Sequence, residues 1–382
     1  MKGKLLMDEN IKEIELLKKE IDELSYDIYV DSYPMSLSEL ISLYKENDIN
    51  LKAEYQRVFK WTPEQKTKFI ESLLLGLPIP PIFLYQGEDA LWEVVDGIQR
   101  LSTIFEFVGI LKDLNNEVKP ELILTSAPKL TYLEGLKFSN FPKDLERTFR
   151  KCKLDLIIIS KKSKKDIKLE VFRRLNGFGT KLNSQELRNA LALLIDSSLF
   201  TFLDTMSNNK TFLSCLPLKD TEIEDKKHYE YFIRFLTLYE QDTLAEIKRK
   251  GISKAIIDDL FDQVIENIAD QNKFNRYNAQ MTFIETFDLL YSTFGENVFK
   301  KYDHKKEKFQ GPIRESIFEA IIPGVSKNID YYKKHKNILT EKILNMHLDD
   351  SLFKKATSKN PKAIDRMSRL LNISIKYFEP NE

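Results

Sequence analysis

Apolar side chains recur at helical spacing in the first half of the chain. Thr62 can cap a first helical turn, and Pro63 has the φ angle that the first helical position requires. Apolar residues then fall every three or four positions as far as Leu74, so they share one face. Gly76 ends this periodicity. The pattern predicts an amphipathic helix between Thr62 and Gly76.

Two short apolar runs follow, and both are typical of β-strands. Residues 80–85 and 91–95 are rich in β-branched and aromatic side chains and are bounded by proline and glycine. Gly87 lies between them, so the sequence predicts a hairpin. A third run, residues 154–159, contains three consecutive isoleucines and also indicates a strand.

Helical periodicity returns at residue 163 and is the only pattern visible beyond residue 228. We therefore predict an α+β protein, with a small mixed sheet and surrounding helices in its first half and an all-α second half. The predicted domains are an N-terminal amphipathic helix in 1–34, an α+β domain in 35–225 and a helical domain in 226–382. The heptads in 11–24 are too few for a confident coiled coil, so a helix lying on its own domain is favoured over a dimer seam.

Composition supports two folded domains and excludes several classes of site. The chain has 382 residues, 42% of them hydrophobic, and no apolar run long enough to cross a bilayer. We expect a cytoplasmic protein that does not associate with a membrane. Its two cysteines stand alone, and its four histidines form no metal-binding pair, which argues against a zinc site and against an HNH nuclease centre. Any metal would be bound by oxygen atoms.

Charge is distributed unevenly along a chain whose formal net charge is zero. Residues 300–376 hold 18 lysines and arginines against 9 acidic residues, a net charge of +9 that the rest of the chain balances. One interpretation is a segment that binds the phosphates of DNA or RNA; the other is a solvated helix face. The candidate nucleic-acid-binding residues are Lys300, Lys301, Lys305, Lys306, Lys308, Lys333, Lys334 and Lys336.

The segment with the clearest candidate chemistry is a strand that ends in Asp96-Gly97, where a helix begins at once. A glycine there lets the backbone approach a ligand, and the N–H groups of the first helical turn favour a phosphate. Arg100 offers a fork for phosphate oxygens, Asp96 can hold Mg²⁺ or take a proton, and Gln99 can orient water. An Asp-Gly pair also simply makes good turns, so these residues do not identify a site by themselves.

Flanking motifs make the assignment more specific. Tyr55-Gln56-Arg57, followed by Trp61, precedes the LPIPPIFLY run; DGIQRL comes next, and Phe172-Arg173-Arg174-Leu175-Asn176 with Gly179 follows. In this order and at these intervals, over about residues 35–240, the motifs resemble those of the N-terminal module of GmrSD-type restriction proteins. The resemblance implies a ParB/sulfiredoxin-like fold that binds and hydrolyses nucleoside triphosphates in systems that restrict modified or foreign DNA.

The resemblance assigns roles residue by residue and shows one departure. Ile98 stands where the family usually has Gln. If that Gln positions water or phosphate, this protein is expected to hydrolyse nucleotide slowly. If that Gln only packs, Ile at this position does not affect hydrolysis. Ile98 continues the apolar stripe of the helix, which favours the packing interpretation. The catalytic candidates are Asp96, Gln99 and Arg100, with Asp96 also the candidate Mg²⁺ ligand. The nucleotide-binding candidates are Gln56, Arg57, Gly97, Arg100, Arg174, Asn176, Gly179 and Thr180.

Three hypotheses for the function remain at this stage. In the first, the chain is a nucleoside-triphosphate sensor or regulator of a restriction or anti-phage system whose nuclease, of the HEPN or HNH type, is a separate subunit. In the second, the lysine-rich segment binds nucleic acid. In the third, the chain controls a partner nuclease by contact alone, as an antitoxin does, without hydrolysing nucleotide. A binding panel with nucleotides and DNA, together with co-purification of partners, would separate the three.

Overall fold

The structure is a computed structural model, and it describes residues 13–23, 29–51, 61–87, 89–113, 115–160, 167–178, 184–249, 257–348, 351–357 and 362–380. The chain divides into two compact units, Met1–Lys181 and Leu182–Glu382. Each unit has its own buried core, and each is described by itself below.

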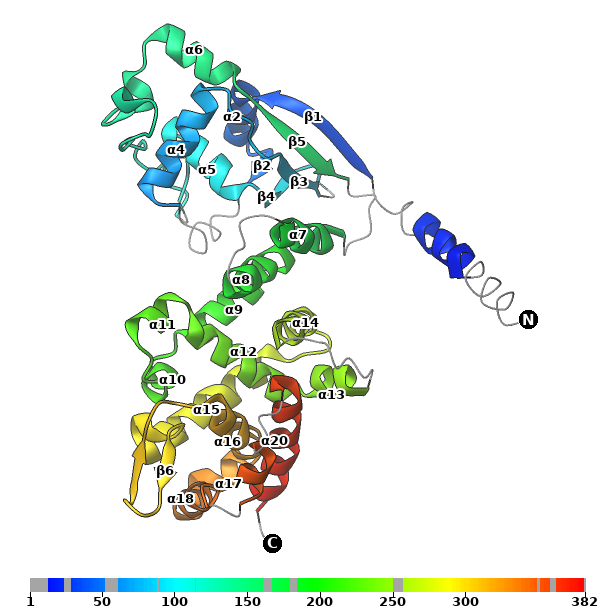
Figure 1. Ribbon diagram of the computed structural model, residues 1–382, viewed down its shortest axis with the longest axis vertical. Helices are drawn as coiled ribbons and strands as arrows, with labels where there is room; N and C mark the ends of the chain where they lie inside the picture. Colours follow the sequence, from blue (N-terminus) through cyan, green and yellow to red (C-terminus); the bar gives the residue numbers. More distant parts are fainter. Residues whose placement is uncertain are drawn as a thin grey trace, which may run out of the picture. The chain divides into compact units, whose positions relative to one another are not determined.

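The first unit combines a sheet with helices (Figure 1). Residues 13–23 form a helix whose apolar side chains are about half exposed, among them Ile14, Leu17 and Ile21. The remaining elements are β1 (Val30–Ser36), α2 (Leu37–Glu46), β2 (Ile49–Asn50), α4 (Pro63–Leu74), β3 (Ile82–Gln86), β4 (Trp92–Asp96), α5 (Ile98–Phe107), η1 (Thr131–Leu133), η2 (Phe138–Asn140), α6 (Lys143–Lys151), β5 (Lys153–Ile159) and α7 (Ile167–Phe178).

The sheet of the first unit is mixed, with the strand order β1-β5-β3-β4-β2. β1 and β5 are antiparallel, β5 and β3 parallel, β3 and β4 antiparallel, and β4 and β2 parallel. The predicted hairpin is confirmed as β3 and β4, and the predicted strand at 154–159 is confirmed as β5. The prediction of an α+β protein with a small mixed sheet is therefore confirmed.

Helices α2, α4 and α5 bury apolar faces in the core of the first unit. Thr62 and Gln65 form the capping box expected at the start of α4, and Pro63 is its first residue. Tyr44 of α2 stacks on Phe105 of α5, with ring centroids 4.1 Å apart. The ring contact holds α5, and with it the turn that precedes it, against α2.

The second unit is mainly helical. Its elements are α8 (Ser184–Ile195), α9 (Ser197–Ser207), α10 (Lys210–Cys215), α11 (Asp220–Glu224), α12 (Lys227–Glu240), α13 (Asp242–Arg249), α14 (Ile257–Ala269), α15 (Arg276–Phe294), η3 (Gly295–Asn297), β6 (Lys301–Asp303), β7 (Lys308–Gln310), α16 (Glu315–Lys327), α17 (Ile329–Lys334), α18 (Lys336–Asn345), α19 (Leu352–Thr357) and α20 (Ala363–Tyr377).

The prediction that the second half is all-α was wrong in one segment. β6 and β7 pair antiparallel as a two-stranded ribbon, with Tyr302 opposite Phe309. The strands are three residues long and carry lysines next to the aromatic residues, so they lack the apolar run by which strands are usually recognised. The charged stretch that resembled a loop is a hairpin.

The compact units divide at a different place from the predicted domain boundary. We placed that boundary at 225/226, in the polar stretch around Lys219–Lys227, whereas the division falls between Lys181 and Leu182. The polar stretch contains α11 and the start of α12, and the Lys227 ammonium donates to the Glu222 carboxylate at 2.8 Å across it. Its charges therefore pair with one another inside the second unit.

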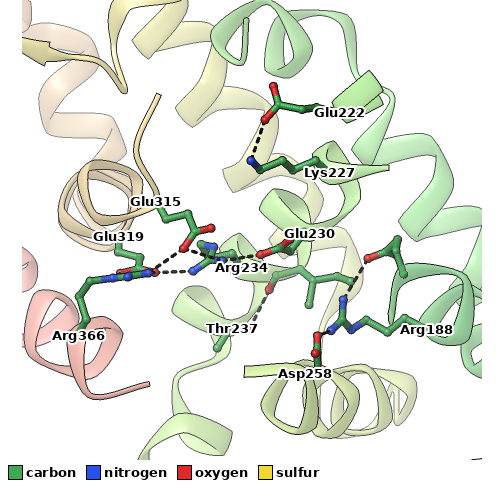
Figure 2. A network of polar contacts seen from close by, with 12 residues as sticks. Arg188, Glu222, Lys227, Glu230, Arg234, Thr237, Asp258, Glu315, Glu319 and Arg366 are labelled. Carbon is green, nitrogen blue, oxygen red and sulfur yellow. Dashed lines mark hydrogen bonds and ion pairs between the residues drawn. The ribbon is translucent and has the colours of Figure 1, made fainter. Parts of the chain in front are cut away.

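Buried arginines connect several helices of the second unit through ion pairs (Figure 2). Arg234 of α12 is 1% exposed and pairs with Glu230, Glu315 and Glu319, and Arg366 of α20 pairs with Glu315 and Glu319 of α16. These ion pairs satisfy charges that would be costly to bury alone.

A second buried arginine joins α8 to this group. Arg188 of α8 is 2% exposed and pairs with Asp258 and Asp262 of α14. The guanidinium carbons of Arg188 and Arg234 lie 5.2 Å and 5.4 Å from the centroid of the Phe261 ring. Phe261 therefore links the two sets of ion pairs.

No helix among the described residues combines the length and the apolar character that crossing a membrane requires.

Candidate functional site

The strand-to-helix turn at Asp96-Gly97 has the backbone geometry that the sequence predicts. β4 ends at Asp96, α5 begins at Ile98, and Gly97 between them has φ of 96°. A Cβ atom on Gly97 would lie 2.4 Å from Cδ1 of Ile82 on β3. The left-handed conformation favours glycine here, and a larger residue would also displace the Ile82 side chain.

Arg100 points back at this turn and is bound by protein groups. Its Nη2 donates to Oδ2 of Asp96 at 2.7 Å, and its Nη1 donates to the carbonyl oxygens of Pro80 and Pro81, at 3.1 Å to Pro81. Its side chain is 11% exposed. Burial lowers the pKa of Arg100, and the carboxylate of Asp96 opposes that effect. The guanidinium thus fastens the segment before β3 to the end of β4.

Gln99 connects the first motif to the second. Its Oε1 accepts a hydrogen bond from the backbone N–H of Trp61 at 3.1 Å, and the Trp61 ring packs edge-on against Phe69. Ile98 beside it is 6% exposed. The structure therefore brings Trp61 next to the turn and places Ile98 in the core, where it packs.

The third motif lies on α7, which the structure holds against β4. The Lys168 ammonium pairs with the carboxylate of Glu93 and lies 5.3 Å from the centroid of the Tyr85 ring. Arg174 is exposed on the same helix and donates to Glu170 at 2.6 Å. The sequence did not indicate Lys168 and Glu93, because their pairing depends on how α7 crosses the sheet and neither belongs to a motif.

Several predicted site residues fall outside the described part of the chain. Gln56 and Arg57 belong to the undescribed segment 52–60, and Gly179 and Thr180 belong to 179–183. The backbone of Asn176 is in the last turn of α7, but its side chain is not described. Their contribution to nucleotide binding stays a prediction.

Asp96 is the candidate Mg²⁺ ligand, and one of its carboxylate oxygens is occupied by Arg100. The described residues contain no group of three or more His, Cys, Asp or Glu side chains that could hold a metal ion. A Mg²⁺ ion at Asp96 would therefore have to take most of its ligands from phosphate and water, as it commonly does in nucleotide sites.

The eight candidate lysines of the second unit separate into two groups by their contacts. Lys300 donates to Glu296 at 2.9 Å, Lys333 pairs with Glu285 at 2.8 Å, and Lys336 donates to Ser292 at 3.2 Å. These three ammonium groups are thus already paired or hydrogen-bonded within the second unit. The exposed lysines with no ion pair among the described residues are Lys301, Lys305, Lys306, Lys308 and Lys334.

Comparison with known protein families gives a match that begins at α2 in the first unit and ends within α8. Residues 37–193 match the family model described as GmrSD restriction endonuclease, N-terminal domain. This part of the chain is a module of that family, as the motifs indicated. No curated protein and no solved structure was found to match the chain.

Proposed function

We propose that the chain is a nucleoside-triphosphate-binding, and hydrolysing, sensor or regulator of a DNA restriction system that acts with a separate nuclease. The family match supports a role in a restriction system. The observation that carries the nucleotide assignment is the turn at Gly97, where β4 passes into α5 through a left-handed glycine and Arg100 folds back to pair with Asp96.

Arg100 can serve a triphosphate by exchanging its partners. In the structure its guanidinium is held by neutral carbonyl oxygens of Pro80 and Pro81 and by Asp96. A phosphate oxygen carries more charge than a carbonyl oxygen, so it competes well for the same N–H groups. Asp96, once released, becomes available to a Mg²⁺ ion held by the phosphates. Binding and metal recruitment are then coupled through one ion pair.

The fold proposed for this unit is ParB/sulfiredoxin-like. The supporting observations are the family match and a small mixed sheet whose β4 leads through a glycine turn into α5. In such an arrangement the N–H groups of the first turn of α5 favour an anion.

Substitution of Arg100 tests the nucleotide assignment. We expect Arg100→Ala to abolish the rise in melting temperature that ATP or GTP with Mg²⁺ gives to the wild-type protein, because the phosphate loses its fork of donors. The measurement is the melting temperature of each variant with and without nucleotide, so that each variant serves as its own reference.

A matched control is Lys66→Ala, which breaks the 2.6 Å ion pair between Lys66 of α4 and Glu106 of α5 away from the turn. It also removes a cation paired on α5, but it should keep the full response to nucleotide. An Arg100→Ala protein that nucleotide stabilises as much as wild type would refute the assignment.

The second candidate function is nucleic-acid binding or antitoxin-like control of a partner nuclease, of the HEPN or HNH type, without hydrolysis. The exposed lysines of the second unit favour it. Co-purification from the native operon would show a nuclease bound to the chain in either case. Continued inhibition of that nuclease by Arg100→Ala would favour control by contact alone.

A further inference from the structure

We propose that the ribbon formed by β6 and β7, residues 301–310, contacts the backbone of duplex DNA. The inference rests on the second candidate function and is independent of nucleotide binding. Lys301, Lys305, Lys306 and Lys308 are exposed on this ribbon and make no ion pair among the described residues.

The register of the ribbon separates an aromatic face from a basic one. Tyr302 and Phe309 are paired across the strands, and their ring centroids are 5.0 Å apart. Because side chains alternate along a strand, Lys301 and Lys308 lie on the opposite face, together with their cross-strand partners Gln310 and Asp303. Phe309 contacts the ring of Phe294 on α15, so the aromatic face turns toward the helices and the lysines face solvent.

The acidic residues of the ribbon do little to neutralise it. The Asp303 carboxylate accepts hydrogen bonds from the backbone N–H groups of Lys305 and Lys306 and from the Gln310 side chain. It organises the turn; although burial raises the pKa of Asp303, these hydrogen bonds and the charge of Lys306 lower it. Within the part of the chain that the structure describes, Asp303 makes no ion pair with a lysine side chain. Glu307, at the tip with φ of 48°, is the other acidic residue in 301–310. Four lysines therefore outnumber two acids on a segment of ten residues.

The ribbon is anchored to the helices and is presented as a fixed element. His304 Nε2 lies 3.0 Å from the carbonyl oxygen of Leu344 at the end of α18, and the backbone N–H of Arg314 donates to the Phe299 carbonyl at 3.0 Å. Burial and nearby positive charges lower the pKa of His347, which contacts Phe309, to about 4. His347 therefore adds no charge to the ribbon at neutral pH.

A two-stranded ribbon with lysines on its outer face suits duplex DNA better than the alternatives. The major groove of B-form DNA admits such a ribbon, whereas the deep, narrow major groove of an RNA duplex does not. Lysine side chains bind phosphates as point charges and are indifferent to base sequence. We therefore expect binding that depends on salt and hardly on sequence.

Lys333, Lys334 and Lys336 offer a control at a distance from the ribbon. Lys336 begins α18, and the ribbon is anchored at Leu344, eight residues along the same helix or about 12 Å away at 1.5 Å per residue. Lys333 and Lys336 are also engaged by Glu285 and Ser292. Substituting these three lysines removes as much charge as substituting three lysines of the ribbon.

The experiment measures binding of the full chain to a labelled DNA duplex of arbitrary sequence by fluorescence anisotropy over a range of salt concentrations. The ribbon variant is Lys305→Gln, Lys306→Gln and Lys308→Gln; the control variant is Lys333→Gln, Lys334→Gln and Lys336→Gln. We expect the ribbon variant to flatten the slope of log K against log salt by about 2.7, which corresponds to binding weakened by about five-hundredfold at 0.1 M salt relative to a 1 M reference. The control should keep the wild-type slope.

The DNA titrations contain no nucleotide, so that failure of the nucleotide assignment and failure of this proposal remain distinguishable. Equal effects of the two triple variants would mean that the net positive charge of residues 300–376 attracts DNA and that the ribbon has no special role. Equal effects would therefore overturn the proposal. It would also be overturned by wild-type affinity in the ribbon variant, by a wild-type chain that does not bind DNA, or by tighter binding to an RNA duplex than to a DNA duplex. Unchanged melting temperatures would establish that the substitutions at these exposed positions leave the fold intact.

Discussion

Ile98 is the first residue of α5, directly after Gly97, and its side chain is buried among the apolar residues of the first unit. The resemblance to GmrSD-type proteins implies Gln at this position, where this chain has Ile. The side chain that reaches toward the first motif in this structure is that of Gln99, whose oxygen accepts from the Trp61 backbone. The two neighbours thus have different roles, one in packing and one in positioning.

Replacing Ile98 with Gln separates packing from chemistry. We expect Ile98→Gln to lower the free energy of unfolding by about 1–3 kcal/mol, because it places an amide on a buried face. The rate of nucleotide hydrolysis should not change. Urea unfolding and a phosphate-release assay are the measurements, and a hydrolysis rate that rises several-fold would instead show that the missing Gln is catalytic.

The sequence predicted the turn at Gly97 but not the partners of Arg100. A strand that ends in Asp-Gly before an apolar helical stripe is a local pattern, and local patterns can be recognised without a fold. The bonds from Arg100 to the Pro80 and Pro81 carbonyls depend on how closely β3 approaches β4, a tertiary contact that spacing does not reveal. The sequence therefore identified the arginine but gave no information on the carbonyl groups that it contacts.

At the scale of elements, α16 and α20 cross in the second unit with almost no space between their backbones. Gly324 of α16 donates its backbone N–H to Ser374 Oγ at 3.0 Å. A Cβ atom at Gly324 would lie 2.4 Å from the Ser374 carbonyl oxygen and 2.6 Å from Cβ of Phe378. The Ser374 carbonyl oxygen and the Phe378 Cβ atom are fixed by the backbone at the end of α20. A change of side-chain rotamer therefore cannot move either atom away.

We expect Gly324→Ala to destabilise the second unit by about 2–3 kcal/mol, because overpacking at a crossing must push the helices apart. This loss would appear even though Ala is the better helix former. Ser326→Ala, a small change two residues along the same helix, is the control and should cost less than about 1 kcal/mol. Equal stabilities of the two variants in thermal or urea unfolding would contradict the close crossing.

The elements that the sequence predicted are those with a periodic apolar face or a short apolar run bounded by turn residues. α4, α5, β3, β4 and β5 were recovered because each buries a regular apolar face. β1 was missed because five of its seven residues, Val30–Pro34, are exposed, and Pro34 lies within it. β1 is an edge strand paired only with β5, where such exposure and a proline are tolerated.

At the scale of the whole molecule, the family match and the compact units have different limits. The match extends to residue 193, inside α8, whereas the first unit ends at Lys181. α8 packs in the second unit, where Arg188 pairs with Asp258 and Asp262 of α14. The last helix of the family module is thus part of the helical core.

This placement predicts how fragments behave. A fragment of residues 182–382 should unfold cooperatively, whereas 196–382, which lacks α8, should lose several kcal/mol or fail to fold, because α14 loses Arg188 and the buried Leu191 and Leu193. Circular dichroism and thermal unfolding of both fragments are the measurements. Equal stability of the two would show that α8 belongs functionally to the first unit.

The position of α8 also constrains how such a module can be exchanged between genes. A recombination event that joined residues 1–193 to an unrelated partner would include most of α8. The buried Arg188 of this helix would then lack the two acidic residues of α14 with which it pairs. A viable chimaera would need either a junction before α8 or a new partner that already offers such acids. Shuffling of this module is therefore expected to favour breakpoints near residue 181, upstream of where its recognisable sequence ends.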